Sequence, residues 1–423
     1  MHYFEYRNGE LFAEGVPVRR VAREVGTPAY IYSLATLRRH YRVFDQAFTK
    51  TPHLVCFSAK SNSNLAILRA FAKEGSGFDI VSGGELFRAL KAGADPQKIV
   101  FSGVGKKRGE LGYALNAGIL MFNVESEQEL GVLNDVAGSL GKKAPVSLRV
   151  NPDVDAKTHP YISTGMKKNK FGIDIKTSLD VYKKAASLSH LEVIGLDCHI
   201  GSQLTSIAPF VDALSRLREY LDRALLGSLR REGAQIRYLD LGGGLGIQYQ
   251  DEKPPHPDEY AGALIQELQG LDVTLILEPG RVIVGNAGIL VTEVLYLKET
   301  EEKKFVVVDG GMNDLIRPAL YGSYHEVRPV AQREAEIIVA DVVGPICESG
   351  DFFAKDRKIP RPVPGDLLAV MSAGAYGFTM ASNYNSHPRA PEILVDGESF
   401  YVVRGRETFE DLVKGEVIPE ILQ

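Results

Sequence analysis

The chain has 423 residues, of which 44% are hydrophobic and 24% are charged, a composition typical of soluble globular proteins. A formal net charge of −5, with no basic run interleaved with aromatic residues, excludes the electrostatic footprint of a nucleic-acid-binding protein. No apolar run is long enough to span a bilayer, and the opening MHYFEYRNGE lacks the pattern of a secretory signal peptide. We therefore expect neither a membrane nor a nucleic acid as a partner.

The three cysteines, Cys56, Cys198 and Cys347, lie far apart and have no metal-ligand spacing. Two of them, Cys56 and Cys198, fall inside apolar runs typical of strands. This usage is typical of a reduced protein, so we expect a cytoplasmic location and no metal site.

The N-terminal segment 3–18, YFEYRNGELFAEGVPV, contains a turn sequence, RNGE, between aromatic-rich flanks. This pattern predicts a β-hairpin. A helical pattern follows at 34–48, LATLRRHYRVFDQAF.

The next part of the chain alternates apolar strand-like runs with helical patterns. Nearly every one of eight expected strands is followed by a helix, and the strands are almost continuously apolar, as in a parallel sheet whose outer face is covered. Eight such units favour a closed TIM-type (β/α)₈ barrel over an open doubly wound sheet. The strands are expected at 54–57, 78–81, 99–103, 120–124, 146–152, 193–201, 236–244 and 274–281.

After residue 285 the pattern changes to short β-branched runs separated by Gly, Pro and Asp turns, which predicts an all-β domain. The N-terminal hairpin is expected to join it. We therefore expect an α/β plus all-β fold: a barrel over 30–284, inserted into a β domain formed by 1–29 and 285–423.

Polar or conformationally special residues stand at most of the expected strand ends, where barrel enzymes place their functional groups. A single lysine at a strand end can simply reach solvent. Polar residues at the ends of many strands, however, would converge at one end of the barrel and so predict a pocket. The set comprises Lys60, Asp79, Arg149, His199, Ser202, Gly242 to Gly244, and Glu278 to Arg281.

The residue types in this set suggest a chemistry. The glycines of DLGGGLG can bring backbone N–H groups to a phosphate, although glycines also make tight turns. His199 could be an ordinary core histidine, and the neighbouring Cys198 points to the opposite face, which argues against a shared metal. Glu278 ends a buried strand and needs a cationic or N–H partner. Together with Lys60, these groups suit pyridoxal phosphate.

Seven motifs stand in order along nearly the whole chain: FSAKSNSN, HIGSQ, LGGGLGI, EPGR, MNDLIRPALYG, GPICESGD and GAYGFTMASNYNS. They closely resemble those of the diaminopimelate decarboxylases, pyridoxal-phosphate enzymes of the alanine-racemase-like barrel type. The resemblance implies a homodimer that decarboxylates meso-2,6-diaminopimelate to L-lysine and CO₂ in lysine biosynthesis. Ser61 and His387 depart from the usual family residues at positions without a catalytic role.

The resemblance also implies roles for single residues. Lys60 and Cys347 resemble the catalytic pair, the lysine as the Schiff-base residue and the cysteine as a proton donor supplied by the neighbouring subunit. The other implied cofactor ligands are Asp79, His199, Ser202, Gly243, Glu278, Gly280, Arg281 and Tyr376. The implied substrate ligands are Arg281, Arg317, Tyr321, Glu348 and Tyr376.

Two alternative functions remain open at this point, and one loop has two interpretations. A related decarboxylase acting on ornithine, arginine or a carboxylated polyamine shares the barrel, but LIRPALYG with CES suits a substrate with a second carboxylate. A non-catalytic cofactor-binding homologue is disfavoured because Lys60 and Cys347 are both present. The run 165–172, GMKKNKFG, is interpreted as a solvated loop that would also suit a lid.

Overall fold

The computed structural model describes residues 2–154, 170–231 and 234–423. Most of the run 165–172 and of the loop 160–172 lies outside these residues. The chain divides into two compact units, which we call the barrel unit, Arg38–Ile283, and the β unit, Met1–Leu37 with Val284–Gln423.

The barrel unit confirms the predicted (β/α)₈ barrel. Its nine-stranded sheet consists of eight parallel barrel strands and a two-residue addition, β10 (Ile173–Asp174), at the side of β9. The barrel closes because β8 pairs with β9 and β13 pairs with β5. The barrel strands are β5 (His53–Ser58), β6 (Gly77–Ile80), β7 (Ile99–Phe101), β8 (Met121–Val124), β9 (Ala144–Asn151), β11 (Leu191–Asp197), β12 (Tyr238–Asp240) and β13 (Thr274–Leu277).

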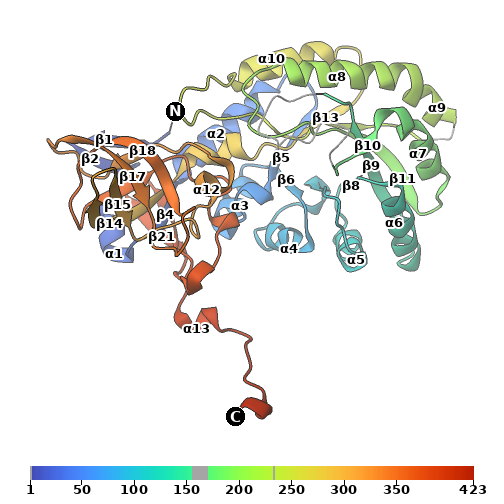
Figure 1. Ribbon diagram of the computed structural model, residues 1–423. Coiled ribbons are helices and arrows are strands. Elements are labelled where there is room, and N and C mark those ends of the chain that lie inside the picture. The colour runs from blue at the N-terminus through green and yellow to red at the C-terminus, as the bar shows by residue number, and fades with distance from the viewer. Residues whose placement is uncertain (1, 155–169, 232–233) are drawn as a thin grey trace. The chain divides into compact units, whose positions relative to one another are not determined.

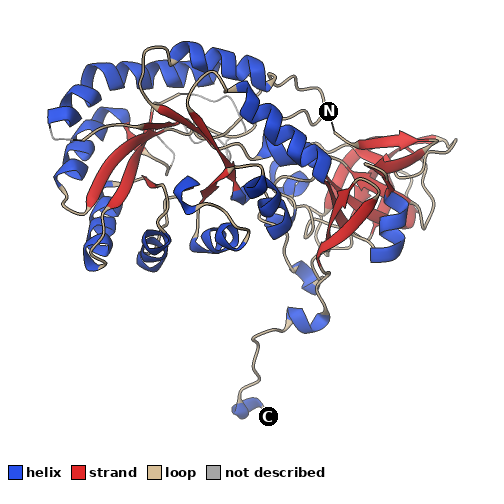
Figure 2. Ribbon diagram, turned by 180° about the vertical axis from the view of Figure 1, so that it is seen from behind, coloured by secondary structure: helices blue, strands red, loops and turns tan. Residues whose placement is uncertain are grey.

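Helices surround these strands, as Figures 1 and 2 show. Several begin at a polar cap that the sequence supplies: the side chains of Asn64, Ser82 and Ser126 accept backbone N–H groups of the first turns of α3, α4 and α6. The helices are α2 (Leu34–Ala47), α3 (Leu65–Lys73), α4 (Gly83–Lys91), α5 (Arg108–Ala117), α6 (Glu127–Ser139), α7 (Ile175–Ser187), α8 (Ala208–Tyr220), α9 (Leu226–Arg231), α10 (Pro257–Glu267) and α11 (Arg281–Val284).

Apolar side chains from five barrel strands pack into one buried cluster: Cys56, Val100, Met121, Ile194 and Ile276. Because neighbouring residues of a strand point to opposite faces, the next inward positions toward the strand ends are free for polar groups. Ser58, two residues after Cys56, is one of them.

The β unit contains two sheets. A small one has the order β1-β2-β3, and a larger one has the order β18-β17-β15-β14-β4-β20-β21, in which β19 also pairs with β14 and β16 pairs with β19. The strands are β1 (Phe4–Arg7), β2 (Glu10–Ala13), β3 (Val16–Pro17), β4 (Ala29–Ser33), β14 (Gly288–Glu299), β15 (Lys304–Val308), β16 (Val327–Pro329), β17 (Ile337–Val343), β18 (Phe352–Pro360), β19 (Leu367–Val370), β20 (Glu392–Asp396) and β21 (Ser399–Arg404). Its helices are α1 (Val18–Val25), α12 (Arg317–Tyr321) and α13 (Phe409–Leu412).

Two details differ from the sequence interpretation. Residues 30–33, expected in the barrel, belong to β4, which pairs with β14 on one side and β20 on the other. All five residues of this strand are buried, as a central strand requires. The β unit also contains helix α1, which the sequence analysis missed.

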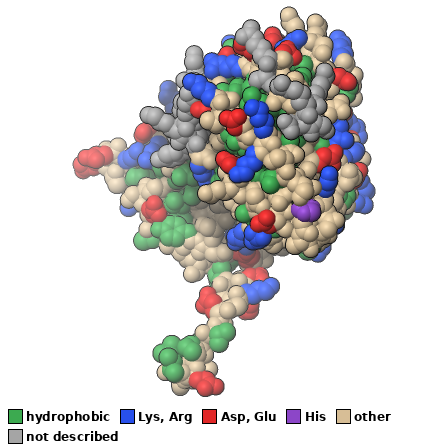
Figure 3. Space-filling model, turned by 90° about the vertical axis from the view of Figure 1, so that its right-hand side faces the viewer, with side chains coloured by type: hydrophobic (Ala, Val, Ile, Leu, Met, Phe, Trp, Pro, Cys, Tyr) green, Lys and Arg blue, Asp and Glu red, His purple; other side chains and the backbone are tan. Residues whose placement is uncertain are grey.

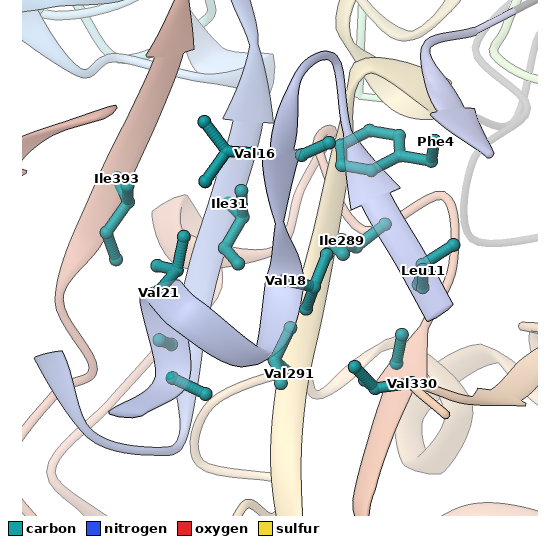
Figure 4. Packing of buried hydrophobic residues seen from close by; sticks show 14 of the residues in the cluster. Phe4, Leu11, Val16, Val18, Val21, Ile31, Ile289, Val291, Val330 and Ile393 are labelled. Carbon is teal, nitrogen blue, oxygen red and sulfur yellow. The ribbon is translucent and has the colours of Figure 1, made fainter. Parts of the chain in front are cut away.

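Side chains from both ends of the chain form the core of the β unit, as Figure 4 shows. Leu11 and Val21 pack with Ile289, Val330 and Ile393 in one buried cluster. The hydrophobic effect therefore holds the N-terminal hairpin against strands that are made much later in the sequence.

The surface is mixed in charge. Figure 3 shows basic and acidic side chains interspersed on the face that it draws. Among the described residues, no helix combines the length and the apolar character that crossing a bilayer requires.

Candidate active site

Lys60 stands just beyond β5, not at the strand's last residue. β5 ends at Ser58, and a single 3₁₀ turn, Ala59–Ser61, carries the lysine. Its Nζ donates a hydrogen bond to Oδ2 of Asp79 on the neighbouring strand β6, and 31% of the side chain remains exposed. The amine is thus aimed by a buried acid while staying accessible.

Asp79 is completely buried. Its Oδ2 also accepts a hydrogen bond of 2.8 Å from the Ser58 hydroxyl. Its Oδ1 has no hydrogen-bond partner among the described residues, which leaves room for one more donor. This acid therefore orients the Lys60 amine.

His199 follows β11 and is half-buried. Its Nδ1 accepts a hydrogen bond of 3.1 Å from the backbone N–H of Gly243, so Nδ1 carries no proton. Burial, together with the charges of Arg149 and Lys60, lowers the pKa of His199 well below its usual range. The imidazole is therefore neutral.

The glycine loop after β12 permits a close backbone approach. A Cβ on Gly243 would lie 2.2 Å from the carbonyl oxygen of Glu278, and a Cβ on Gly242 would lie 2.4 Å from Nδ1 of His199. Gly242 also has a φ of +64°, which side chains disfavour. Any other residue would therefore push the loops after β12, β11 and β13 apart.

Arg281 begins the short helix α11, directly after Gly280 of the EPGR segment. Its guanidinium donates to the Tyr249 hydroxyl at 2.7 Å and to the Ser202 hydroxyl at 3.2 Å. Sequence analysis missed Tyr249, because its contact with Arg281 arises only from the fold.

Glu278 follows β13 and faces a polar network inside the barrel. The Asn123 amide donates to Oδ2 of Asp240 at 3.0 Å and lies 3.5 Å from Oε1 of Glu278. The Ser102 hydroxyl lies 3.4 Å from the same Oε1. Sequence analysis also missed Asn123 and Asp240. Both lie near the ends of barrel strands, β8 and β12, and this position could have indicated that they belong to the site.

A charged pair borders this network. Arg149 in β9 donates to the Glu125 carboxylate at 3.0 Å, and its other terminal nitrogen lies 3.5 Å from the carbonyl oxygen of His199. Both charged side chains are buried. Within the described ranges, no group of three or more His, Cys, Asp or Glu side chains is arranged to hold a metal ion.

The barrel interior concentrates buried acids. Burial, reinforced by neighbouring carboxylates, raises the pKa values of Glu278 and Asp197 well above their usual range. Burial and Asp197 also raise the pKa of Asp240 to about 8. A positive group placed beside Glu278 would favour its ionised form and lower its pKa again.

These shifts predict a pH-dependent stability of the cofactor-free protein. Asp240 has an ordinary pKa of 3.8, so the folded chain keeps a proton that the unfolded chain loses between pH 3.8 and about 8. Its contribution to stability is present at low pH and is lost as the pH rises through that window. In Asp240→Asn, the free energy of unfolding should fall less steeply with pH, by about 1.4 kcal/mol per pH unit. Urea unfolding at a series of pH values measures this slope.

The matched control is Asp180→Asn, since the Asp180 side chain is 85% exposed. It should leave the pH dependence unchanged. Parallel curves for wild type and Asp240→Asn would contradict the prediction.

The remaining predicted residues lie in the β unit. Arg317 and Tyr321 begin and end α12, four residues apart and so on one side of the helix. Cys347 and Glu348 lie exposed on the loop between β17 and β18, where the Cys347 N–H donates to the Asn385 side chain at 2.7 Å. Tyr376 has a φ of +54°, unusual for a side chain of its size.

The barrel-unit residues fit pyridoxal phosphate. Three groups lie around the mouth of the barrel: an accessible lysine amine, a neutral imidazole and a buried carboxyl group. The backbone at Gly242 and Gly243 lies so close to its neighbours that no side chain would fit there. Glu278, whose raised pKa favours the protonated form, could give its proton to a ring nitrogen and would then balance the positive charge of that nitrogen. Arg281 supplies a cation beside the glycine loops, suited to a phosphate.

Comparisons with known proteins agree with this geometry. Residues 34–285 match the family model described as pyridoxal-dependent decarboxylase, pyridoxal binding domain. The diaminopimelate decarboxylase of Pseudomonas aeruginosa is 58% identical over 416 residues, 98% of this chain and 99% of that protein. The solved diaminopimelate decarboxylase from Helicobacter pylori, complexed with L-lysine, is 44% identical with a TM-score of 0.89, covering 94% of this chain and 98% of that one. Its M. jannaschii counterpart, also with L-lysine, is 38% identical with a TM-score of 0.93, covering 99% of both chains.

Proposed function

The chain belongs to the diaminopimelate decarboxylases, and on that basis we propose that it converts meso-2,6-diaminopimelate to L-lysine and CO₂, the last step of lysine biosynthesis. The observation that carries the proposal is the barrel mouth, where Lys60 is aimed by Asp79 beside a neutral His199. Bound pyridoxal phosphate supplies an electron sink for the bond that breaks.

In the proposed site, Lys60 would hold the cofactor covalently, and Asp79 would keep its amine in position. Glu278 would pair with the pyridine nitrogen, and His199 would contact the ring. The phosphate would be bound by the glycine loops and their neighbours: Ser202, Gly243, Gly280 and Arg281. The high proton affinity of Glu278 in its buried surroundings supports its role.

The β-unit residues are proposed to recognise the substrate and to finish the reaction. Arg317 and Tyr321, with Arg281, bind the carboxylate that is retained, and Glu348 binds the distal ammonium group. Tyr376 contacts both cofactor and substrate. Cys347 would supply from its Sγ the proton that replaces the lost CO₂, and its thiolate would regain a proton from solvent. The exposed thiol and carboxylate of Cys347 and Glu348 are accessible for these roles.

We further propose that the enzyme works in the cytoplasm as a homodimer, in which each β unit completes the site of the partner. The three free thiols suit a reducing compartment. The exposure of Cys347, on a loop whose backbone is held by Asn385, suits a residue that acts on another subunit.

The assay that tests the function compares decarboxylation of meso-diaminopimelate, ornithine and lysine by the enzyme loaded with pyridoxal phosphate. We expect turnover of meso-diaminopimelate alone at a substantial rate, since a site built around a second carboxylate rejects analogues without it by a factor on the order of 10⁴. Preferred turnover of ornithine would favour the related decarboxylases. An absence of turnover on all three would favour a non-catalytic homologue.

Arg317→Met should change substrate selectivity. A guanidinium binds a carboxylate through charged hydrogen bonds, whereas methionine keeps the length of the side chain without the charge. We expect kcat/KM for meso-diaminopimelate to fall by about 100-fold, with a much smaller loss on lysine. Steady-state kinetics on both substrates test this, and equal losses would assign Arg317 a structural role.

A further inference from the structure

Asp351 joins two segments of the β unit that carry predicted site residues. The residue is buried, with 4% of its surface exposed. Its Oδ1 accepts the backbone N–H of Met312 at 2.6 Å, and its Oδ2 accepts the backbone N–H of Ile346 at 2.7 Å. Met312 begins the motif that contains Arg317, and Ile346 directly precedes Cys347. One carboxylate therefore holds these two segments side by side.

The two contacts require the ionised form of Asp351. A backbone N–H can only donate a hydrogen bond, and each oxygen of the carboxyl group faces one such donor. Burial raises the pKa of Asp351, while the N–H groups of Met312 and Ile346 favour the charged form and oppose this shift. An amide of the same shape has only one acceptor oxygen, so it could not satisfy both donors.

The carboxylate is packed directly against the backbone, because a glycine stands at the point of contact in each segment. A Cβ on Gly311 would lie 3.0 Å from Oδ1 of Asp351. A Cβ on Gly344 would lie 2.6 Å from Oδ2 and 2.5 Å from the Cα of Gly311. These separations are shorter than van der Waals contacts, so the position of the carboxylate determines how closely the two segments approach.

Further hydrogen bonds hold the loop on both sides of Cys347. The N–H of Cys347 donates to the Asn385 side chain at 2.7 Å, and the N–H of Asp351 donates to the carbonyl oxygen of Glu348 at 3.1 Å. The loop therefore follows Asp351 at both of its ends, and a displaced carboxylate would move Cys347 and Glu348 together.

We propose that Asp351 is a positioning residue for the reaction: its carboxylate holds the loop that carries Cys347 and Glu348 at a fixed distance from the segment that carries Arg317. The proposal rests on the proposed functions of these three residues. Asp351 acts through them and touches no reacting atom.

Asp351→Asn has a matched control in Glu14→Gln. Glu14 also lies in the β unit and accepts backbone N–H groups of two distant segments, one on each oxygen: that of Ala35 at 2.9 Å and that of Gly397 at 2.7 Å. Neither segment carries a predicted site residue. Both substitutions replace an acceptor oxygen by a donor, so both should lower the midpoint of thermal unfolding.

Only Asp351→Asn should change the reaction. We expect its kcat for meso-diaminopimelate, per Lys60-bound cofactor, to fall about tenfold or more. The solvent deuterium isotope effect on kcat should rise, because a displaced Cys347 delivers its proton more slowly. Glu14→Gln should keep kcat within about twofold of wild type and leave the isotope effect unchanged. Counting the bound cofactor by borohydride reduction excludes unfolded protein from the comparison.

Hydrogen–deuterium exchange of the cofactor-free protein tests the two contacts without any turnover. In Asp351→Asn, the amide of Met312 or that of Ile346 should exchange about tenfold faster than in wild type, and in Glu14→Gln both should be unchanged. Wild-type exchange at both amides of Asp351→Asn would overturn the proposal. Equal changes of kcat and of the isotope effect in the two variants would also overturn it, since Asp351 would then act on stability alone.

Gly311→Ala provides a second test that remains available if Asp351→Asn does not fold. Its methyl group would displace the carboxylate of Asp351 by a few tenths of an ångström and leave the charge in place. We expect a smaller fall of kcat and a rise of the isotope effect. A folded Gly311→Ala enzyme with wild-type values of both would overturn the proposal.

The proposed function can fail separately from this inference. Wild-type enzyme without turnover of meso-diaminopimelate would overturn the function, whereas the exchange rates of the Met312 and Ile346 amides are measured on protein without cofactor or substrate. The two failures are therefore distinct.

Discussion

Lys60→Ala should abolish covalent attachment of pyridoxal phosphate and lower turnover by a factor on the order of 10⁴ or more, the scale on which loss of a covalent catalytic residue acts. The nearest competitor after a barrel strand is Lys106, which follows β7. Its amine is buried and donates to the carbonyl oxygens of Gly103 and Asn123 and to the Glu129 carboxylate. The amine of Lys106 is therefore fully used in hydrogen bonds within the fold, and we expect that it cannot replace Lys60.

Borohydride reduction followed by peptide mass spectrometry measures the attachment directly. Lys60→Arg is the matched control, since it keeps a cation for Asp79 and yet cannot form the covalent bond. Both variants should lose the linked peptide. A linkage at another specific lysine in Lys60→Ala would show that the assignment of Lys60 is wrong.

Mixing two inactive variants of the proposed homodimer should restore activity. If Cys347 acts on the partner's site, Lys60→Ala and Cys347→Ala homodimers are both severely impaired, because each lacks one component in both sites. Subunit exchange at equal amounts gives about half heterodimers, each with one intact and one doubly damaged site. Activity should therefore recover to about a quarter of wild type.

Two affinity tags, one on each variant, measure the exchange independently of activity. The control mixes Lys60→Ala with Lys60→Arg, which can restore no site in any combination. Confirmed exchange without recovery would place Cys347 in its own subunit's site or outside the chemistry.

The barrel could be predicted because each parallel strand is a nearly unbroken apolar run followed by a helical pattern. The ends of such strands then locate Asp79, Arg149, Glu278 and the glycine loop, since geometry alone gathers strand ends. The turn that carries Lys60 could not be placed to the residue, because a strand and the turn after it share the same buried composition.

The supporting polar residues could not be predicted in the same way. Asn123 meets Asp240 across 117 residues of sequence, and Arg281 meets Tyr249 across 32. Such contacts depend on strand register, which one sequence does not reveal. Helix α1 is different: Val18, Val21 and Ala22 are buried with helical spacing, so the sequence does carry a signal for this helix directly after the hairpin.

The position of β4 in the sheet has a consequence for the synthesis of the chain on the ribosome. Its Tyr32 hydroxyl donates to the Glu392 carboxylate, 360 residues later, and the strand pairs on that side with β20. A ribosome adding about 5 to 20 residues per second needs about 20 to 70 seconds to make that distance. Throughout this interval β4 has an unpaired edge, which can form hydrogen bonds with strands of other chains. The barrel sequence is contiguous and can fold during this time. The nascent chain is therefore most prone to aggregation near its N-terminus, which is made first.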